Sequence, residues 1–147
     1  MISLLKKASV SLMALMLVCT SASAAGNATK SNKTSGFDWN PVMEAIIQVE
    51  SGGNPRAVSG NSVGAMQITP ILVKQCNIIL QQQKSKKRYT LADRYSVEKS
   101  KEMFLLIQSV HNPQNNVEKA IRTWNGGPNY SVRATNRYYQ KVMSKMK

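Results

Sequence analysis

Apolar residues recur at helical spacing along most of the chain after residue 39, and few stretches alternate as a strand would. Val42, Met43, Ile46 and Val49 follow the helical period, so we predict a first helix with Asn40 as N-cap and Pro41 in its first turn, ending before the Gly52-Gly53 pair. Cap and breaker residues predict four more helices: from Thr69-Pro70, from near Ser96 to His111, from about Asn116 to Trp124, and from about Val132. The sequence does not decide whether the loop 51–69 contains short turns or a small hairpin. The overall pattern predicts a mainly α fold.

One acidic residue lies on the apolar side of the first helix. With Val42 at 0° and about 100° per residue, Glu50 falls near 80°, between Ile46 at about 40° and Met43 at about 100°. Partial burial and the negative end of the helix dipole both disfavour a carboxylate, so the pKa of Glu50 should lie above its ordinary value. A carboxyl group kept protonated near neutral pH suits a general acid. The alternative is a frayed last turn that leaves Glu50 in solvent.

The first 24 residues have the parts of a secretory signal peptide: basic Lys6 and Lys7, an apolar run over 8–18, and small residues at 22–24. An uncleaved membrane anchor and a lipid anchor at Cys19 are the alternatives. We therefore expect a signal peptide over 1–24, a flexible spacer over 25–38 and one folded domain over 39–147, in a secreted or periplasmic protein. After cleavage only Cys76 remains, and its apolar neighbours predict a buried, unreactive thiol.

The chain is strongly basic, with a formal charge of +13 that becomes +11 once Lys6 and Lys7 are removed. Such an excess indicates an anionic partner: nucleic acid, anionic lipid or an acidic wall polymer. Export argues against nucleic acid. The one dense cluster, 84–88, is interpreted as a solvated loop, with polymer binding as the alternative.

The segment after the first helix carries an ordered set of unlike residues: Glu50-Ser51-Gly52, Asn54-Pro55, Ala57-Val58-Ser59, Gly64-Ala65-Met66-Gln67 and Pro70. It resembles the signature of the lytic transglycosylases with the soluble-transglycosylase (SLT) domain, which is similar to goose-type lysozyme. Trp124-Asn125-Gly126-Gly127 and an aromatic C-terminal helix, with a Tyr138-to-Val142 or Tyr139-to-Met143 step, match further family elements. Two departures are Ala65, where Leu is common, and Trp124, where Tyr is common.

The resemblance implies a lysozyme-like fold with a substrate cleft and cleavage of the bond between N-acetylmuramic acid and N-acetylglucosamine in peptidoglycan, without water. Glu50 would act as acid and then as base, closing a 1,6-anhydro ring. Ser51 would orient Glu50 or the sugar N-acetyl group, or only end the helix. The substrate-binding residues implied are Ser51, Met66, Gln67, Trp124, Asn125 and Tyr138. Core packing is the alternative for Met66, Trp124 and Tyr138.

Three rival interpretations stay open: a hydrolysing muramidase on the same fold, a non-catalytic wall-binding or secretion-assembly protein, and a cationic membrane-active protein that acts through its C-terminal helix. We expect no cofactor and no metal, since His111 is the single histidine and should be a solvated helix-end residue. The expected partner is the peptidoglycan glycan strand, with a secretion or conjugation machine as a further candidate, no nucleic acid, and a monomeric protein.

Overall fold

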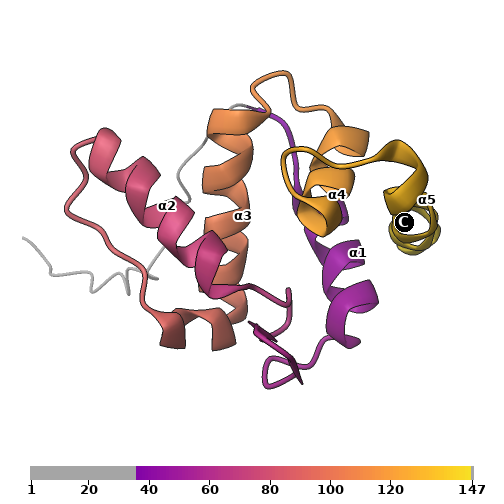
Figure 1. Cartoon of the computed structure of the whole chain (residues 1–147), viewed down its shortest axis with the longest axis horizontal. Coiled ribbons are helices and arrows are strands. Elements are labelled where there is room, and N and C mark those ends of the chain that lie inside the picture. The colour runs from indigo at the N-terminus through magenta and orange to yellow at the C-terminus, as the bar shows by residue number, and fades with distance from the viewer. Residues whose placement is uncertain (1–35, 147) are drawn as a thin grey trace, which may run out of the picture. The chain divides into compact units, whose positions relative to one another are not determined.

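Five α-helices, one 3-10 helix and a two-stranded hairpin make up residues 36–146, the part of the chain that the computed structural model describes (Figure 1). The elements are α1 (Asn40–Ser51), β1 (Val58–Ser59), β2 (Ser62–Val63), α2 (Pro70–Gln82), η1 (Leu91–Tyr95), α3 (Val97–His111), α4 (Val117–Gly126) and α5 (Val132–Lys145). This confirms the mainly α prediction. The predicted signal peptide, Cys19 and most of the spacer lie outside the described residues.

Side-chain caps fix the starts of four helices, as the sequence predicts. Thr69, Ser96 and Asn116 each accept a backbone N–H of the first turn, from Leu72, Lys99 and Lys119. Ser131 does the same for α5. These bonds satisfy amides that a helix start leaves without partners.

The predicted cap of α1 is wrong by one residue. Asn40 is the first helical residue and Trp39 is the N-cap, because the N–H of Met43 already bonds to the Trp39 carbonyl at 3.0 Å. Asp38 serves the exposed start instead, accepting the Asn40 backbone N–H at 2.9 Å. The other end agrees with prediction: Gly52 takes a left-handed conformation, with φ of 62°, and closes the helix.

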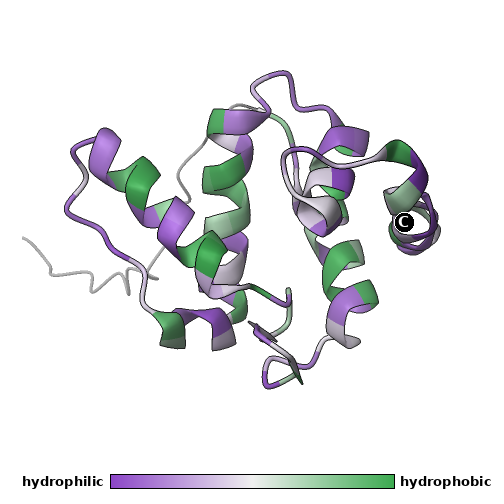
Figure 2. Cartoon of the chain, in the orientation of Figure 1, coloured by the Kyte–Doolittle hydropathy of each residue, from purple (hydrophilic) through white to green (hydrophobic). Residues whose placement is uncertain are grey.

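All five α-helices contribute buried residues to one core, together with the segment 65–68. Figure 2 shows hydrophobic residues gathered along α1 and α3, whereas α5 and the segment after α2 are mostly hydrophilic. Phe104 at the centre touches Trp39 and Trp124, with ring centroids 5.6 and 5.2 Å apart. Cys76 is fully buried, which confirms the prediction of a buried thiol, and burial raises the pKa of this thiol to about 12. No helix within residues 36–146 has the length and apolar character to cross a bilayer.

The loop 51–69 contains the hairpin that the sequence left open, with Val58 paired to Val63 and Ser59 to Ser62. An additional bridge joins Val63 to Ile68 and closes the segment 64–67 into a tight loop. The 3-10 helix η1 packs beneath this loop and was not predicted. Its buried Arg94 donates to the carbonyls of Asn61 and Ile68, at 3.1 and 3.2 Å, and so ties η1 to the hairpin.

We predict that Gly64→Ala destabilises the fold far more than Gly60→Ala. Both glycines have positive φ, which costs a non-glycine residue about 1–2 kcal/mol. A Cβ on Gly60 meets open space, whereas one on Gly64 falls 1.8 Å from the Arg94 carbonyl oxygen. Urea unfolding should give a loss of at least about 3 kcal/mol for Gly64→Ala and about 1 kcal/mol for Gly60→Ala. Equal losses would contradict the close approach of η1 to the loop.

Candidate active site

Glu50 lies in the last turn of α1 with a half-buried side chain, as the helical wheel predicts. Burial raises the pKa of its carboxyl group above the ordinary value. Within the described residues no Lys or Arg pairs with it, and Arg56, the nearest basic residue in sequence after the turn, is exposed. The group is therefore desolvated without a counter-charge.

Tyr138 of α5 reaches this carboxyl group. Its hydroxyl donates a hydrogen bond of 2.7 Å to Glu50 Oε1. The bond favours the carboxylate and partly offsets the effect of burial on the pKa of Glu50. Burial and the neighbouring carboxylate raise the pKa of Tyr138, so the phenol keeps its proton. The resemblance implied a sugar contact for Tyr138, with core packing as the alternative; the structure adds a direct contact with the Glu50 carboxyl group, and the sugar contact stays a prediction.

The loop 64–67 presents three successive carbonyls to side-chain donors from three places in the chain. Gly64 O accepts from Gln67 Nε2 at 2.9 Å, Ala65 O from Ser51 Oγ at 2.8 Å, and Met66 O from Trp124 Nε1 at 3.3 Å. Backbone carbonyls enclosed by a fold need such partners. The Ser, Gln and Trp of the sequence motifs therefore hold the loop against α1 and α4.

The side chains of Ser51 and Gln67 are therefore already hydrogen-bonded within the protein, unlike side chains that are free to bind a substrate. The Ser51 hydroxyl also lies 3.2 Å from the Ile47 carbonyl, and it fixes the end of α1 with no bond to Glu50 itself. Gln67 has a φ of 52° and also donates to the Ala57 carbonyl at 3.2 Å. Each side chain is half-buried and keeps some exposed surface. Sugar contact by either one stays a prediction.

Met66 requires a correction. Its side chain is fully buried in the core, with 0% of its surface exposed, so the packing alternative holds and no part of it faces a sugar. Trp124 is half-buried against Phe104, so packing is established for it too, although part of the ring stays accessible. Asn125 follows on the exposed end of α4.

A pocket of about 490 Å³ opens beside Trp124 and Asn125, between α2, α3 and α4. Leu72 and Ile107 supply apolar walls, while Gln75 and Gln108 supply amides. His111 is exposed at its rim, as predicted for a helix-end histidine. The pocket lining does not include Glu50 or Tyr138. The structure thus brings Trp124 and Asn125 to one concavity, and the Trp124–Met66 bond connects it to the loop beside Glu50.

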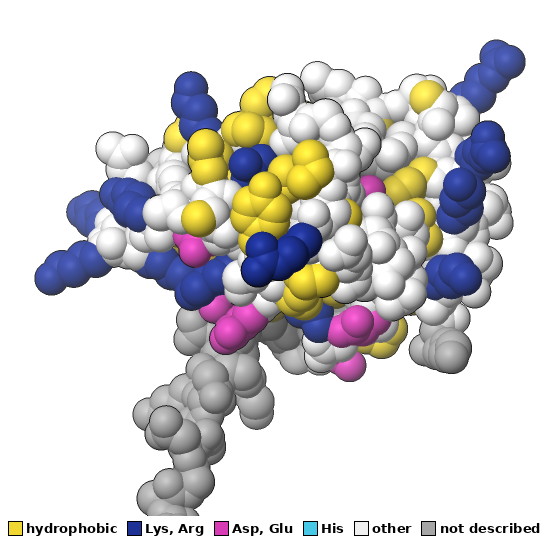
Figure 3. All heavy atoms as spheres, turned by 90° about the horizontal axis from the view of Figure 1, so that it is seen from below, with side chains coloured by type: hydrophobic (Ala, Val, Ile, Leu, Met, Phe, Trp, Pro, Cys, Tyr) yellow, Lys and Arg dark blue, Asp and Glu magenta, His cyan; other side chains and the backbone are white. Residues whose placement is uncertain are grey.

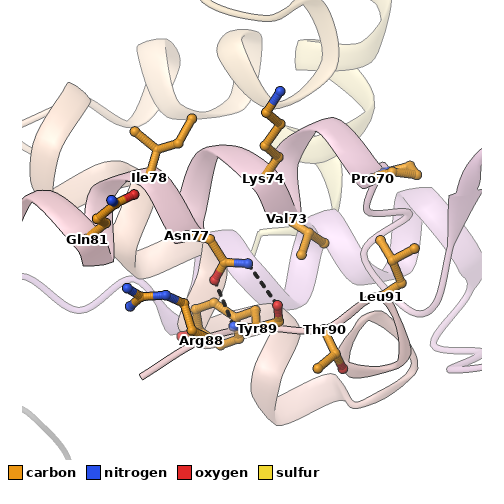
Figure 4. A pocket seen from close by; sticks show the side chains of 10 residues that line it. All are labelled: Pro70, Val73, Lys74, Asn77, Ile78, Gln81, Arg88, Tyr89, Thr90 and Leu91. Carbon is orange, nitrogen blue, oxygen red and sulfur yellow. Dashed lines mark hydrogen bonds between the residues drawn. The ribbon is translucent and has the colours of Figure 1, made fainter. Parts of the chain in front are cut away.

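A second pocket, of about 430 Å³, lies between α2 and the segment 88–91 (Figure 4). Asn77 closes its floor by bonding both the N–H and the carbonyl of Tyr89, each at 2.8 Å. Lys74 and Arg88 line it, and no carboxyl group does. This second pocket therefore offers no carboxyl group that could transfer a proton to a bound molecule. Within residues 36–146, no cluster of three metal-ligating side chains occurs.

Two contacts in and near the candidate site were not predicted from the sequence. The Glu50–Tyr138 bond spans 88 positions, and no local signal reports such a pairing. Arg94 was missed because η1 was missed, yet Asp93, three residues after Thr90, is a helix-start signal that the sequence does contain. In the structure the Asp93 carboxylate accepts the Thr90 backbone N–H at 2.6 Å.

Comparison with known proteins identifies a family for the chain. The family model of the transglycosylase SLT domain matches residues 26–147, which includes Glu50, the loop 64–67, Trp124 and Tyr138. Searches of the curated proteins and of the solved structures gave no match. From the helical architecture and this match over most of its length, we conclude that the chain belongs to the transglycosylase SLT domain family, lysozyme-like enzymes that act on the glycan strands of peptidoglycan.

Proposed function

We propose that this protein is an exported lytic transglycosylase that cleaves the β-1,4 bond between N-acetylmuramic acid and N-acetylglucosamine, with Glu50 as its single acid and base. The observation that carries the proposal is the isolation of Glu50. It is half-buried, it bonds to a phenol, and it has no cationic partner among the described residues. Export rests on the signal-peptide pattern of residues 1–24.

Every other carboxyl group of the described residues has a different environment. Glu44 pairs with Lys101, Glu102 with Lys87 and Lys99, and Glu118 with Arg122. Asp38 and Asp93 bond to helix-start amides, and Glu98 is exposed in the first turn of α3. Hydrolysis by two carboxylates needs a second acid across the scissile bond. Its absence from the surroundings of Glu50 favours a one-carboxylate reaction.

The reaction balances with Glu50 alone. The protonated carboxyl group gives its proton to the glycosidic oxygen as the bond from that oxygen to C1 of muramic acid breaks. The sugar N-acetyl group stabilises the positive charge at C1. The Glu50 carboxylate then removes the proton of the C6 hydroxyl as O6 bonds to C1, which forms the 1,6-anhydro ring and regenerates the acid. No water is consumed.

Tyr138 determines which oxygen carries the proton. Its hydroxyl donates to Oε1, so the proton of neutral Glu50 resides on Oε2, the oxygen left for the substrate. Tyr138 also keeps its own proton, because its pKa is raised. It therefore serves as a positioning residue for the acid. The pocket beside Trp124 and Asn125 is the proposed continuation of the glycan-binding surface.

The first test removes the acid. Glu50→Gln keeps the shape and the acceptor for Tyr138 but loses the transferable proton, so turnover of purified peptidoglycan should fall at least about 100-fold. Glu98→Gln, at an exposed site, is the matched control and should keep wild-type turnover. Mass analysis of the wild-type products should give anhydro-muropeptides. Reducing ends would instead establish a muramidase, and the absence of any product a binding protein.

Folding of the Glu50→Gln variant is checked by its melting temperature. Because burial raises the native pKa of Glu50 above the unfolded value, wild-type stability falls as the pH rises from the unfolded to the native pKa. Gln has no such titration. At pH 7 the variant should melt at or above the wild-type temperature, and a clearly lower value would contradict the desolvated state of Glu50.

The second test concerns Tyr138. Its hydrogen bond stabilises the carboxylate, so Tyr138→Phe should raise the pKa of Glu50 further and move the alkaline limb of the activity profile to higher pH. Tyr139→Phe removes a hydroxyl from the neighbouring ring, which stacks on Arg122, and should leave the limb in place. The pKa would be read by NMR titration of the Glu50 carboxyl carbon. A limb that moves to lower pH would refute the role given to Tyr138.

A further inference from the structure

Helix α5 carries four basic residues at four-residue spacing: Arg133, Arg137, Lys141 and Lys145. All four side chains are exposed. Residues four apart on a helix are neighbours, about 6 Å apart along its axis, so these residues form one row, here called the α5 ridge. Figure 3 shows Lys and Arg side chains gathered along the right edge of the molecule, the side on which α5 lies in Figure 1.

The positive charge of the α5 ridge is not compensated within the described residues. Helix α5 contains no Asp or Glu, and none of the four ion pairs involves a ridge residue. Among the helices packed against α5, α1 and α4 supply Glu44, Glu50 and Glu118. Glu44 and Glu118 pair with other cations, and Glu50 bonds to Tyr138. The ridge is therefore available to an external anion.

The C-terminal half of the ridge lies on the edge of α5 that is nearer to Glu50. At about 100° per residue, Lys145 lies about 20° and Lys141 about 60° from Tyr138 around the helix axis, whereas Arg137 lies about 100° and Arg133 about 140° away on the same side. Tyr139 lies on the opposite edge of the buried stripe and stacks on Arg122 of α4. Since Tyr138 touches the carboxyl group of Glu50, the Lys141 and Lys145 end of the ridge borders the candidate active site.

We infer that the α5 ridge binds the carboxylates of the peptide stems that peptidoglycan strands carry on their muramic acid residues. The inference rests on the proposed function. The sugar rings are uncharged, so the free carboxylates of the stems are the anions that a bound strand brings closest to its scissile bond. Long, flexible Lys and Arg side chains at regular spacing can follow stems that differ in length and cross-linking.

A lipid surface fits the ridge less well. A helix that lies on a membrane presents an apolar face beside its basic one. The apolar face of α5 is occupied, since Thr135 and Val142 are buried against the rest of the domain. Of its large apolar residues, Val132 and Met143 are the exposed ones, at 59% and 38%. An anionic polymer therefore fits the α5 ridge better than a lipid bilayer does.

The test compares two triple variants in the inactive Glu50→Gln background, so that turnover does not alter the ligand. The first changes Arg137, Lys141 and Lys145 to Gln. The second, with the same loss of charge, changes Lys74, Lys84 and Lys86 to Gln; these are exposed and lie on α2 and in the loop after it. Calorimetric titration uses uncrosslinked glycan strands of matched length, with their stems or after an amidase has removed them.

We expect the ridge variant to bind stem-bearing strands about tenfold more weakly, because three exposed ionic contacts are lost together. Its binding to stem-free strands should change little. The control variant should lose less than twofold. High salt should abolish the preference of the parent Glu50→Gln protein for stem-bearing strands.

Three results would overturn the inference. Equal weakening in both variants would assign the effect to net charge or to polymer binding shared with the 84–88 cluster, and equal weakening on both strands would assign the ridge to the sugars. Binding to anionic phospholipid vesicles that exceeds binding to strands, and that the ridge variant loses, would assign the ridge to a membrane. A wild-type protein that forms no anhydro product would refute the proposed function separately, while the strand comparison would still decide the ridge.

Discussion

The geometry around Glu50 depends on a short buried loop whose backbone must find hydrogen-bond partners. The loop 64–67 turns tightly under the end of α1, where Gly64 approaches η1 too closely for any side chain. Its carbonyls point toward Gln67, Ser51 and Trp124, each of which supplies a donor. Because those donors come from the loop itself, from α1 and from α4, satisfying the loop also sets the positions of both helices. The position of Glu50 at the end of α1 therefore depends on the hydrogen bonds of this loop.

This requirement explains why the motif residues are what they are. Ser51 has a hydroxyl within reach of Ala65 O, and the Trp124 indole can reach Met66 O while its ring packs on Phe104. A donor that also fills volume suits a position between loop and core. Most of these motif residues therefore serve to give buried backbone carbonyls a hydrogen-bond donor. Among the motif residues, only Glu50 has a pKa raised by burial.

Local features of the fold could be predicted from the sequence, whereas contacts between distant segments could not. Thr69, Ser96 and Asn116 cap their helices as predicted, since a cap involves residues only three apart. The side of α1 that holds Glu50 follows from its period. By contrast, the burial of Met66 depends on every element around the loop, and the partner of Glu50 comes from a helix 88 residues later. Periodicity contains no information on such pairings.

The separation between Glu50 and Tyr138 has a consequence for the order in which the molecule is made. A chain grows from its N-terminus, so the acid and the loop 64–67 are synthesised long before α5 exists. Until residues 132–145 have emerged and docked, Glu50 has no phenol beside it and no helix covering that side. The surroundings of Glu50 are therefore completed only after α5 has been made, and a chain interrupted before Tyr138 holds the proposed acid without its hydrogen-bond partner.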